Sequence, residues 1–164
     1  MPTDINEHTI RNFKMADNEL VVEFFDQMGG ESRAFFNRGD GNRQNALEFF
    51  RKNGEEPGAV RFLSSVTEKG KEVMTGYVFA WDTNSMIPTL GIAVREEYKG
   101  KGLGRRLIKH LTDHLESIGC GGVMLTTSVA NIRGQSLYTR MGFEHVGTHV
   151  SGELLFILKF KKTT

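Results

Sequence analysis

A basic, glycine-rich turn between a predicted strand and a predicted helix constrains the fold of this chain more than any other segment. The apolar strand ends near Val94, and glycines follow at positions 100, 102 and 104. From Gly102 to Ile118, apolar residues then recur every three or four positions, which is one face of an amphipathic helix of about four turns. The chain must therefore mix strands and helices, as α/β and α+β domains do.

The same turn has the properties of an anion-binding site. Alternating glycines let several backbone N–H groups point at one position without interference from Cβ atoms. The N-terminus of the following helix adds partial positive charge there. Four basic side chains add full charges, so we expect a ligand that carries phosphate; they are Lys99, Lys101, Arg105 and Arg106. A tight strand-to-helix connection without a ligand is the alternative explanation.

Two common phosphate-binding loops do not fit the spacing. The loop of nucleoside triphosphatases needs Gly-Lys followed by Ser or Thr, whereas Gly104 is followed by Arg105. The dinucleotide-binding fingerprint needs a third glycine at the position that Leu107 occupies. We therefore expect neither of these protein classes.

Composition fits one globular domain over residues 1–164. With 38% hydrophobic and 25% charged residues, the chain can bury an ordinary core. The formal net charge of +1 does not favour a nucleic-acid-binding face. The single cysteine, Cys120, excludes an intrachain disulfide and a cysteine-rich metal site, and we expect it to be a small buried residue.

We expect a cytoplasmic protein without a membrane segment or a metal. The N-terminus lacks the pattern of a secretory signal, and the apolar runs are too short to span a bilayer. His110 and His114 have the spacing of a metal-binding pair on a helix, but no acidic or cysteine ligand accompanies them.

Hydrophobic periodicity predicts a sheet flanked by helices. Pro88 and Gly91 predict either a bulge in their strand or a place where it parts from its neighbour. The last two strands are expected to pair as a hairpin. The predicted strands are 8–14, 59–67, 72–81, 87–94, 123–127, 144–150 and 154–160, and the predicted helices are 18–28, 46–52, 102–118 and 135–141.

Two separate motifs in residues 60–160 give the chain a resemblance to the GNAT superfamily of N-acetyltransferases. The first is Gln or Arg, two residues, Gly, one residue, and Gly or Ala; Lys99, Gly102 and Gly104 stand at these positions. Lysine keeps the charge of arginine but loses its planar fork. The second motif is followed by Asn131, Gly134, Leu137, Tyr138, Gly142 and Phe143, with Gly134 where alanine is more usual.

The resemblance implies an α+β fold with a mixed, mostly antiparallel sheet of about seven strands. It implies acetyl-CoA as co-substrate, with the diphosphate on the glycine turn and the pantetheine arm along the backbone of Ile92 and Val94, where the sheet opens between strands 87–94 and 123–128. A homodimer is the assembly it suggests. The implied CoA-binding residues are Ile92, Ala93, Val94, Lys99, Gly100, Lys101, Gly102, Leu103, Gly104, Arg105, Asn131 and Tyr138.

The resemblance also implies that Tyr138 is the catalytic residue, which protonates the departing thiolate of CoA. A tyrosine packed on the apolar face of a short helix is the structural alternative. Asn131 is equally well explained as an ordinary helix cap. No ionisable side chain occurs in residues 85–94, so the general base is open; the candidates are Glu31, Glu72, Asp82 and His149.

The predicted reaction is transfer of an acetyl group to a primary amine of a small molecule or peptide, by direct attack in a ternary complex. Residues 25–45 and the terminal hairpin are expected to contact this acceptor, including Glu31, Arg33, Phe35, Phe36 and Asp40. A non-catalytic acyl-CoA-binding module of the same fold is the alternative, because the strand before the glycine turn carries no carboxylate.

Overall fold

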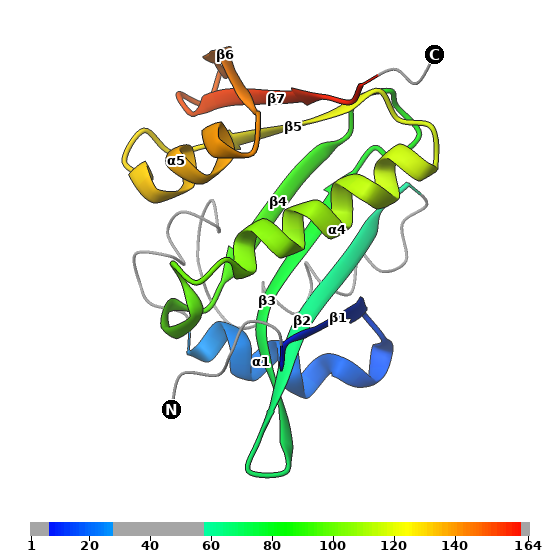
Figure 1. Cartoon of the computed structure of the whole chain (residues 1–164), viewed down its shortest axis with the longest axis vertical. Coiled ribbons are helices and arrows are strands. Elements are labelled where there is room, and N and C mark those ends of the chain that lie inside the picture. The colour runs from blue at the N-terminus through cyan, green and yellow to red at the C-terminus, as the bar shows by residue number, and fades with distance from the viewer. Residues whose placement is uncertain (1–6, 28–57, 162–164) are drawn as a thin grey trace.

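The computed structural model describes residues 7–27 and 58–161 (Figure 1). The predicted helix 46–52 lies outside these residues. Predicted and observed elements agree closely along the rest of the chain. The strands are β1 (Thr9–Asn12), β2 (Val60–Glu68), β3 (Lys71–Trp81), β4 (Thr89–Val94), β5 (Gly122–Thr127), β6 (Glu144–Thr148) and β7 (Leu154–Lys159), and the helices are α1 (Asn18–Asp26), α4 (Leu103–Ser117) and α5 (Ile132–Arg140).

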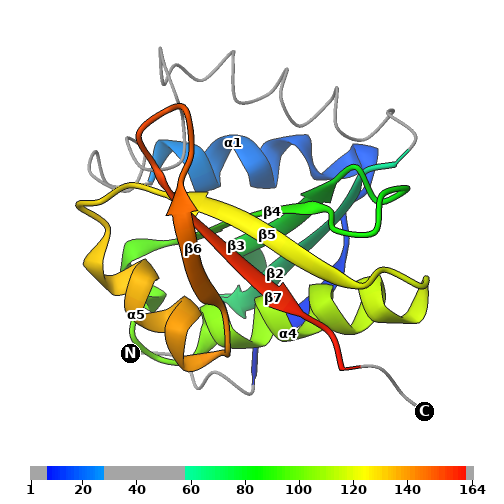
Figure 2. The ribbon, with the colours of Figure 1, turned by 90° about the horizontal axis from the view of Figure 1, so that it is seen from above.

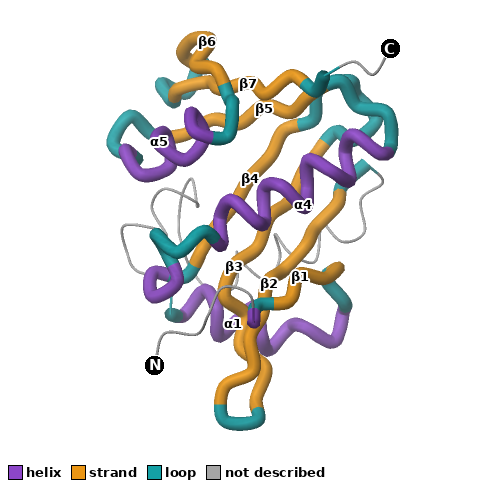
Figure 3. Tube along the Cα trace, in the orientation of Figure 1, coloured by secondary structure: helices purple, strands orange, loops and turns teal. Residues whose placement is uncertain are grey.

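The strands form one seven-stranded sheet in the order β1-β2-β3-β4-β5-β7-β6 (Figure 3). All neighbouring strands are antiparallel except β4 and β5, which are parallel. This confirms the prediction of a mixed, mostly antiparallel sheet and of a terminal hairpin, β6–β7.

Helices cover both faces of the sheet. Figure 2 shows α1 on one side and α4 and α5 on the other. On the α1 side, Phe24 and Phe25 pack with Tyr77 and Phe79 of β3. On the α4 side, the apolar stripe of the helix is fully buried against the sheet, and each such side chain contributes about 1.5–3 kcal/mol. Its residues are Leu103, Leu107, Ile108, Leu111 and Leu115.

The sheet opens between β4 and β5. Within the described residues these strands are in register at one position only, where Thr89 lies opposite Met124. Toward Val94 and Thr127 the two strands separate, and β5, β7 and β6 run at an angle to β1–β4 (Figure 1). The parting of strand 87–94 from its neighbour is therefore confirmed.

The alternative prediction, a bulge within this strand, is wrong. The register of β3 and β4 runs without interruption from Trp81–Thr89 to Gly76–Val94. The irregularity lies between β2 and β3, next to Ser64 and Ser65. Gly91 has a different purpose: a Cβ atom there would lie 2.1 Å from Cζ of Phe79, so the glycine makes room for the ring.

Helix α5 begins at Ile132, earlier than predicted, because the Asn131 side chain caps it and Gly134 is accommodated within its first turn. Cys120 is buried, as expected, with its thiol 3.7 Å from the carbonyl oxygens of Thr83 and Ser85. None of the helices in the described ranges has the length and apolar character needed to cross a membrane.

Candidate functional site

The glycine turn ends β4 and leads into α4 through backbone conformations that favour glycine. Gly100 has φ +77° and Gly102, the N-cap of α4, has φ +92°, both in the left-handed region. The first helical hydrogen bond runs from the Arg106 N–H to the Gly102 carbonyl, at 3.1 Å. Within the described ranges no backbone carbonyl accepts from the amides of residues 100–105. These donors are therefore available to an anion.

The third glycine of the turn serves packing. A Cβ atom at Gly104 would lie 3.1 Å from Cδ2 of Leu137, so the missing side chain lets α5 approach the first turn of α4. The three glycines thus have two roles: two shape the turn, and one sets the distance between the helices.

The basic side chains of the turn point in different directions. Lys99 pairs with Glu96 at 3.0 Å, and the Lys101 ammonium lies 5.8 Å above the ring of Tyr98. Arg105 is exposed. Arg106 instead donates to the carbonyl of His8 at 3.2 Å, which ties α4 to the residue before β1. Its predicted contribution to the anion site is therefore not supported by this geometry.

Tyr98 links the turn to β2 and to the residue before β1 through its contacts with Glu68 and His8. Its hydroxyl donates to Glu68 at 2.5 Å, and its ring meets that of His8 edge-on at 5.0 Å. Burial, with the Glu68 carboxylate, raises the pKa of Tyr98 to about 12. His8 is buried, bonded through Nδ1 to Thr75 at 2.9 Å, and burial lowers its pKa. The turn therefore rests on a polar cluster in which Tyr98, His8 and Thr75 of β3 are buried and Glu68 of β2 is exposed.

The open edge of β4 presents the backbone of Ile92 and Val94. The Arg95 N–H donates to the Thr75 carbonyl at 2.9 Å, so Val94 and Gly76 form a non-hydrogen-bonded pair of the β3–β4 ladder. By alternation along the strand, the N–H and C=O groups of Val94 and Ile92 face away from β3, toward the opening. Ala93, opposite Tyr77, directs its groups to β3. Of the three predicted strand residues, two have main-chain groups at the opening.

Tyr138 lies on the buried face of α5, only 7% exposed, with its ring near Phe143 and Phe156. Burial raises the pKa of its phenol to about 12. The group is therefore a neutral phenol at neutral pH, with a hydroxyl proton that it can donate.

Asn131 is an N-cap. Its Oδ1 accepts from the Gly134 N–H at 3.1 Å, and its Nδ2 donates to Oγ1 of Thr127 at 2.9 Å. A Cβ atom at Gly134 would lie 2.4 Å from this Nδ2, which explains glycine at that position. The helix-cap interpretation is confirmed, and contact of Asn131 with CoA stays a prediction.

Arg133 also lies beside the turn, although the sequence patterns did not single it out. Its Nη2 lies 3.8 Å from the position of a Cβ at Gly100, so its guanidinium adjoins the turn. The available signal was its place two residues after Asn131, within the second motif.

Of the four candidate bases, two have hydrogen-bond partners, one lies near the start of β4, and one is outside the described residues. Glu72 accepts from Arg11 at 2.7 Å, and Nδ1 of His149 accepts from the Ser151 N–H at 3.1 Å. Asp82 lies beyond β3, toward the start of β4. Glu31 lies outside the described residues, as do the candidate acceptor contacts Arg33, Phe35, Phe36 and Asp40.

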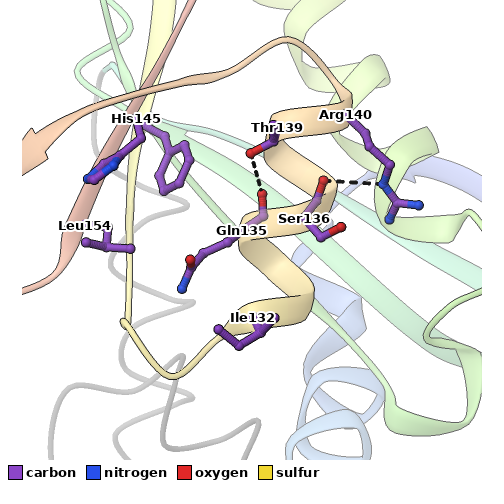
Figure 4. Close-up of a pocket in the computed structure, with 8 residues that line it drawn as sticks. Ile132, Gln135, Ser136, Thr139, Arg140, His145 and Leu154 are labelled. Atoms are coloured by element: carbon purple, nitrogen blue, oxygen red, sulfur yellow. Dashed lines mark hydrogen bonds between the residues drawn. The ribbon is translucent and has the colours of Figure 1, made fainter.

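The structure also shows the surroundings of the histidine pair and a hollow beside α5. The rings of His110 and His114 pack edge-on against Phe62, at 4.5 and 5.6 Å. A hollow of about 480 Å³ lies between the outer face of α5 and the β6–β7 hairpin (Figure 4). It is lined by Ile132, Gln135, Ser136, Thr139, Arg140, His145, Leu154 and Phe156.

A mixed sheet that opens beside an amide-lined turn at a helix N-terminus is the architecture of acyl-CoA N-acyltransferases. The chain belongs to the Acetyltransferase (GNAT) family, whose model matches residues 31–143.

Relatives and solved structures agree with this family. The [ribosomal protein bS18]-alanine N-acetyltransferase of Escherichia coli K12 is 32% identical over 84 residues, 51% of this chain and 55% of that protein. The spermine/spermidine N(1)-acetyltransferase of Bacillus subtilis is 40% identical over 55 residues, 33% of this chain and 36% of that protein. The chain thus matches about half the length of the first relative and less of the second.

The fold itself is shared over nearly the whole chain. The structure of the PaiA N-acetyltransferase from Thermoplasma acidophilum in complex with coenzyme A has a TM-score of 0.74 at 15% identity, with 93% of this chain and 99% of that one covered. The E. coli ribosomal-protein-S18-alanine N-acetyltransferase gives 0.70 at 22% identity, with 96% of each chain covered. At these identities the likeness concerns the fold alone.

Proposed function

We propose that this protein transfers an acetyl group from acetyl-CoA to a primary amine of a small molecule or peptide. The main support is the parting of β4 from β5 beside the turn whose amides at residues 100–105 have no backbone acceptor in the described part of the chain. The opening suits an extended ligand arm, and the turn suits a phosphate group at the end of that arm.

In this proposal the diphosphate of CoA accepts hydrogen bonds from the amides of Gly100 to Arg105. Lys99, Lys101 and Arg105 add charge at the same place. The arm carries amide groups of its own, which pair with the main-chain groups of Ile92 and Val94. The turn is open at Gly102, where a Cβ would meet no atom of the described residues within 4 Å, its chain neighbours aside.

The proposed chemistry is direct attack of the acceptor nitrogen on the thioester carbonyl carbon. The C–N bond forms, the C–S bond breaks, and Tyr138 donates its phenolic proton to the departing sulfur. Such general-acid catalysis is typically worth ~10² to 10⁴ in rate. A main-chain N–H at the open edge of β4 stabilises the oxyanion. The amine proton passes to water or to a base outside β4 (Thr89–Val94), which has no ionisable side chain.

The names of the relatives support an amine acceptor without choosing between a peptide and a small molecule. One is named for the alanine of a ribosomal protein and another for spermine and spermidine. We also propose that the protein is cytoplasmic and that it forms a homodimer.

Thermal unfolding with and without ligand tests the binding step. CoA at ~100 times its dissociation constant should add about 2.7 kcal/mol to the free energy of unfolding. For a chain of this length that corresponds to a rise in Tm of about 5 to 10 °C. Absence of a shift with CoA and acetyl-CoA, while ATP or NAD does produce one, would contradict the proposal.

A second candidate function is a non-catalytic acyl-CoA-binding module, favoured by the lack of a carboxylate on β4. The two functions separate in an assay that measures free thiol released from acetyl-CoA in the presence of peptides, polyamines and amino acids. Binding without thiol release from any of these amines would favour the module.

A further inference from the structure

Arg133 is a residue of a second helix, α5, that lies beside the glycine turn. It stands in the first turn of α5, and its Nη2 lies 3.8 Å from the position of a Cβ at Gly100. The close approach of Gly104, in the first turn of α4, to Leu137 of α5 packs the two helices against each other. The backbone of α5 beside the turn is therefore positioned by packing that does not involve Arg133 itself.

The charge at these two helix N-termini runs against the helix dipole. Neither α4 nor α5 has an acidic residue in its first turn, whereas α1 has Glu19 there. Acidic residues stabilise a helix N-terminus and basic residues destabilise it. Arg105 in α4 and Arg133 in α5 thus stand at positions that are unfavourable for the folded protein alone.

No carboxylate of the described chain neutralises these groups. Ion pairs join Lys99 to Glu96 and Lys109 to Asp113, but within residues 7–27 and 58–161 none involves Lys101, Arg105 or Arg133. Arg133 is also exposed, so its guanidinium is open to a ligand. Positive charge that is unfavourable in the free protein and uncompensated within it is typical of an anion-binding site.

We propose that Arg133 is a phosphate-binding residue of the acyl-CoA site, supplied by α5 opposite the amides of the turn. This inference rests on the proposed function. A guanidinium can donate two parallel hydrogen bonds to one phosphate group, which Lys99 at the first motif position cannot do. CoA offers two sources of such oxygens, its diphosphate and its 3′-phosphate.

The test compares CoA and 3′-dephospho-CoA by calorimetry on the wild type, Arg133→Gln, Arg133→Lys and Arg140→Gln. The last variant is the matched control, because Arg140→Gln removes the same charge from the other end of α5. We expect Arg133→Gln to weaken CoA binding about 10- to 100-fold, as loss of a charged hydrogen bond does. Arg133→Lys should be intermediate, and Arg140→Gln should bind as the wild type does.

Melting of the ligand-free variants separates binding from a structural role. The Tm of Arg133→Gln should equal or exceed that of the wild type, because the substitution removes a cation from a helix N-terminus. A variant that binds CoA as tightly as the wild type, or that melts at a lower temperature without ligand, would overturn the inference.

The second ligand identifies the phosphate. If Arg133→Gln weakens CoA but not 3′-dephospho-CoA, Arg133 holds the 3′-phosphate; equal losses assign it to the diphosphate. A wild type that binds neither ligand would overturn the proposed function, and this result is distinct from wild-type binding that Arg133→Gln leaves unchanged.

Discussion

Replacement of Gly102 by alanine tests the turn on which the proposed site depends. The residue is the N-cap of α4 with φ +92°, and, its chain neighbours aside, a Cβ there would meet no atom of the described residues within 4 Å. We therefore expect the effect to come from the backbone conformation. A non-glycine residue in the left-handed region costs about 1 to 2 kcal/mol. For a chain of this size the Tm should fall by about 2 to 8 °C.

The same substitution should weaken CoA binding. The chain can relieve the strain by rotating the peptide groups on either side of Gly102, and this would turn at least one amide away from the point where the diphosphate is proposed to bind. Loss of one hydrogen bond to a charged group is worth about 1.5 to 3 kcal/mol, or at least a tenfold weaker affinity. Melting curves and calorimetry with CoA measure the two effects on the same samples.

Two glycines provide matched controls for this experiment. Gly119, at the other end of α4, has φ +95° and equally open surroundings, so Gly119→Ala should lower Tm to a similar extent and leave CoA affinity unchanged. Gly147 has open surroundings without a positive φ, and Gly147→Ala should change neither property appreciably. The reasoning is refuted if Gly102→Ala is as stable as the wild type, or if it loses stability but binds CoA normally.

Three further predictions concern side chains. Tyr138→Phe should lower kcat ~10²- to 10⁴-fold with little change in KM and Tm, measured by thiol release; an unchanged kcat would exclude the general-acid role. Asn131→Ala should cost about 0.5 to 2 kcal/mol of stability through loss of the cap of α5, and equal melting of variant and wild type would contradict this. His8 has a pKa below its ordinary value, so the stability it confers is complete above pH 6.5 and declines as pH falls below that value. The pKa of His110 is lowered as well, so the contribution of His8 must be isolated with the variant His8→Gln. Urea titrations at pH 7.5 and 5.5 should show that the free energy of unfolding falls less between these pH values in His8→Gln than in the wild type. An equal fall in both proteins would contradict this prediction.

Local sequence patterns predicted the helices and strands of this fold well, because the spacing of apolar residues depends only on which face of each element is buried. The apolar stripe of α4 is a property of that helix alone, and it is buried as predicted. The parting of β4 from β5 was foreseen as one of two options, since Pro88 and Gly91 mark an irregular strand without saying on which side the irregularity lies. The choice depends on Phe79, whose ring crosses Gly91 from the neighbouring strand.

The parts of the candidate site that depend on local backbone conformation could be predicted from the sequence. The parts that depend on packing between distant residues could not. Positive φ at Gly100 and Gly102 is a local requirement of the turn. The purpose of Gly104 depends on Leu137, and the direction of Arg106 depends on the carbonyl of His8, both remote in sequence. Arg133 was missed for the same reason, because its approach to Gly100 exists only once α4 and α5 have packed together.

The site is divided between two parts of the molecule whose strands separate at the point where the ligand is proposed to bind. The turn is held to β1–β4 through Tyr98, Glu68 and His8. Asn131 holds the start of α5 to β5 through Thr127. Between these parts the described strands share only the pair Thr89–Met124. A ligand that contacts the turn, the edge of β4 and α5 would join both parts, and its binding energy would therefore also fix the width of the opening in which Tyr138 is proposed to meet the sulfur of CoA.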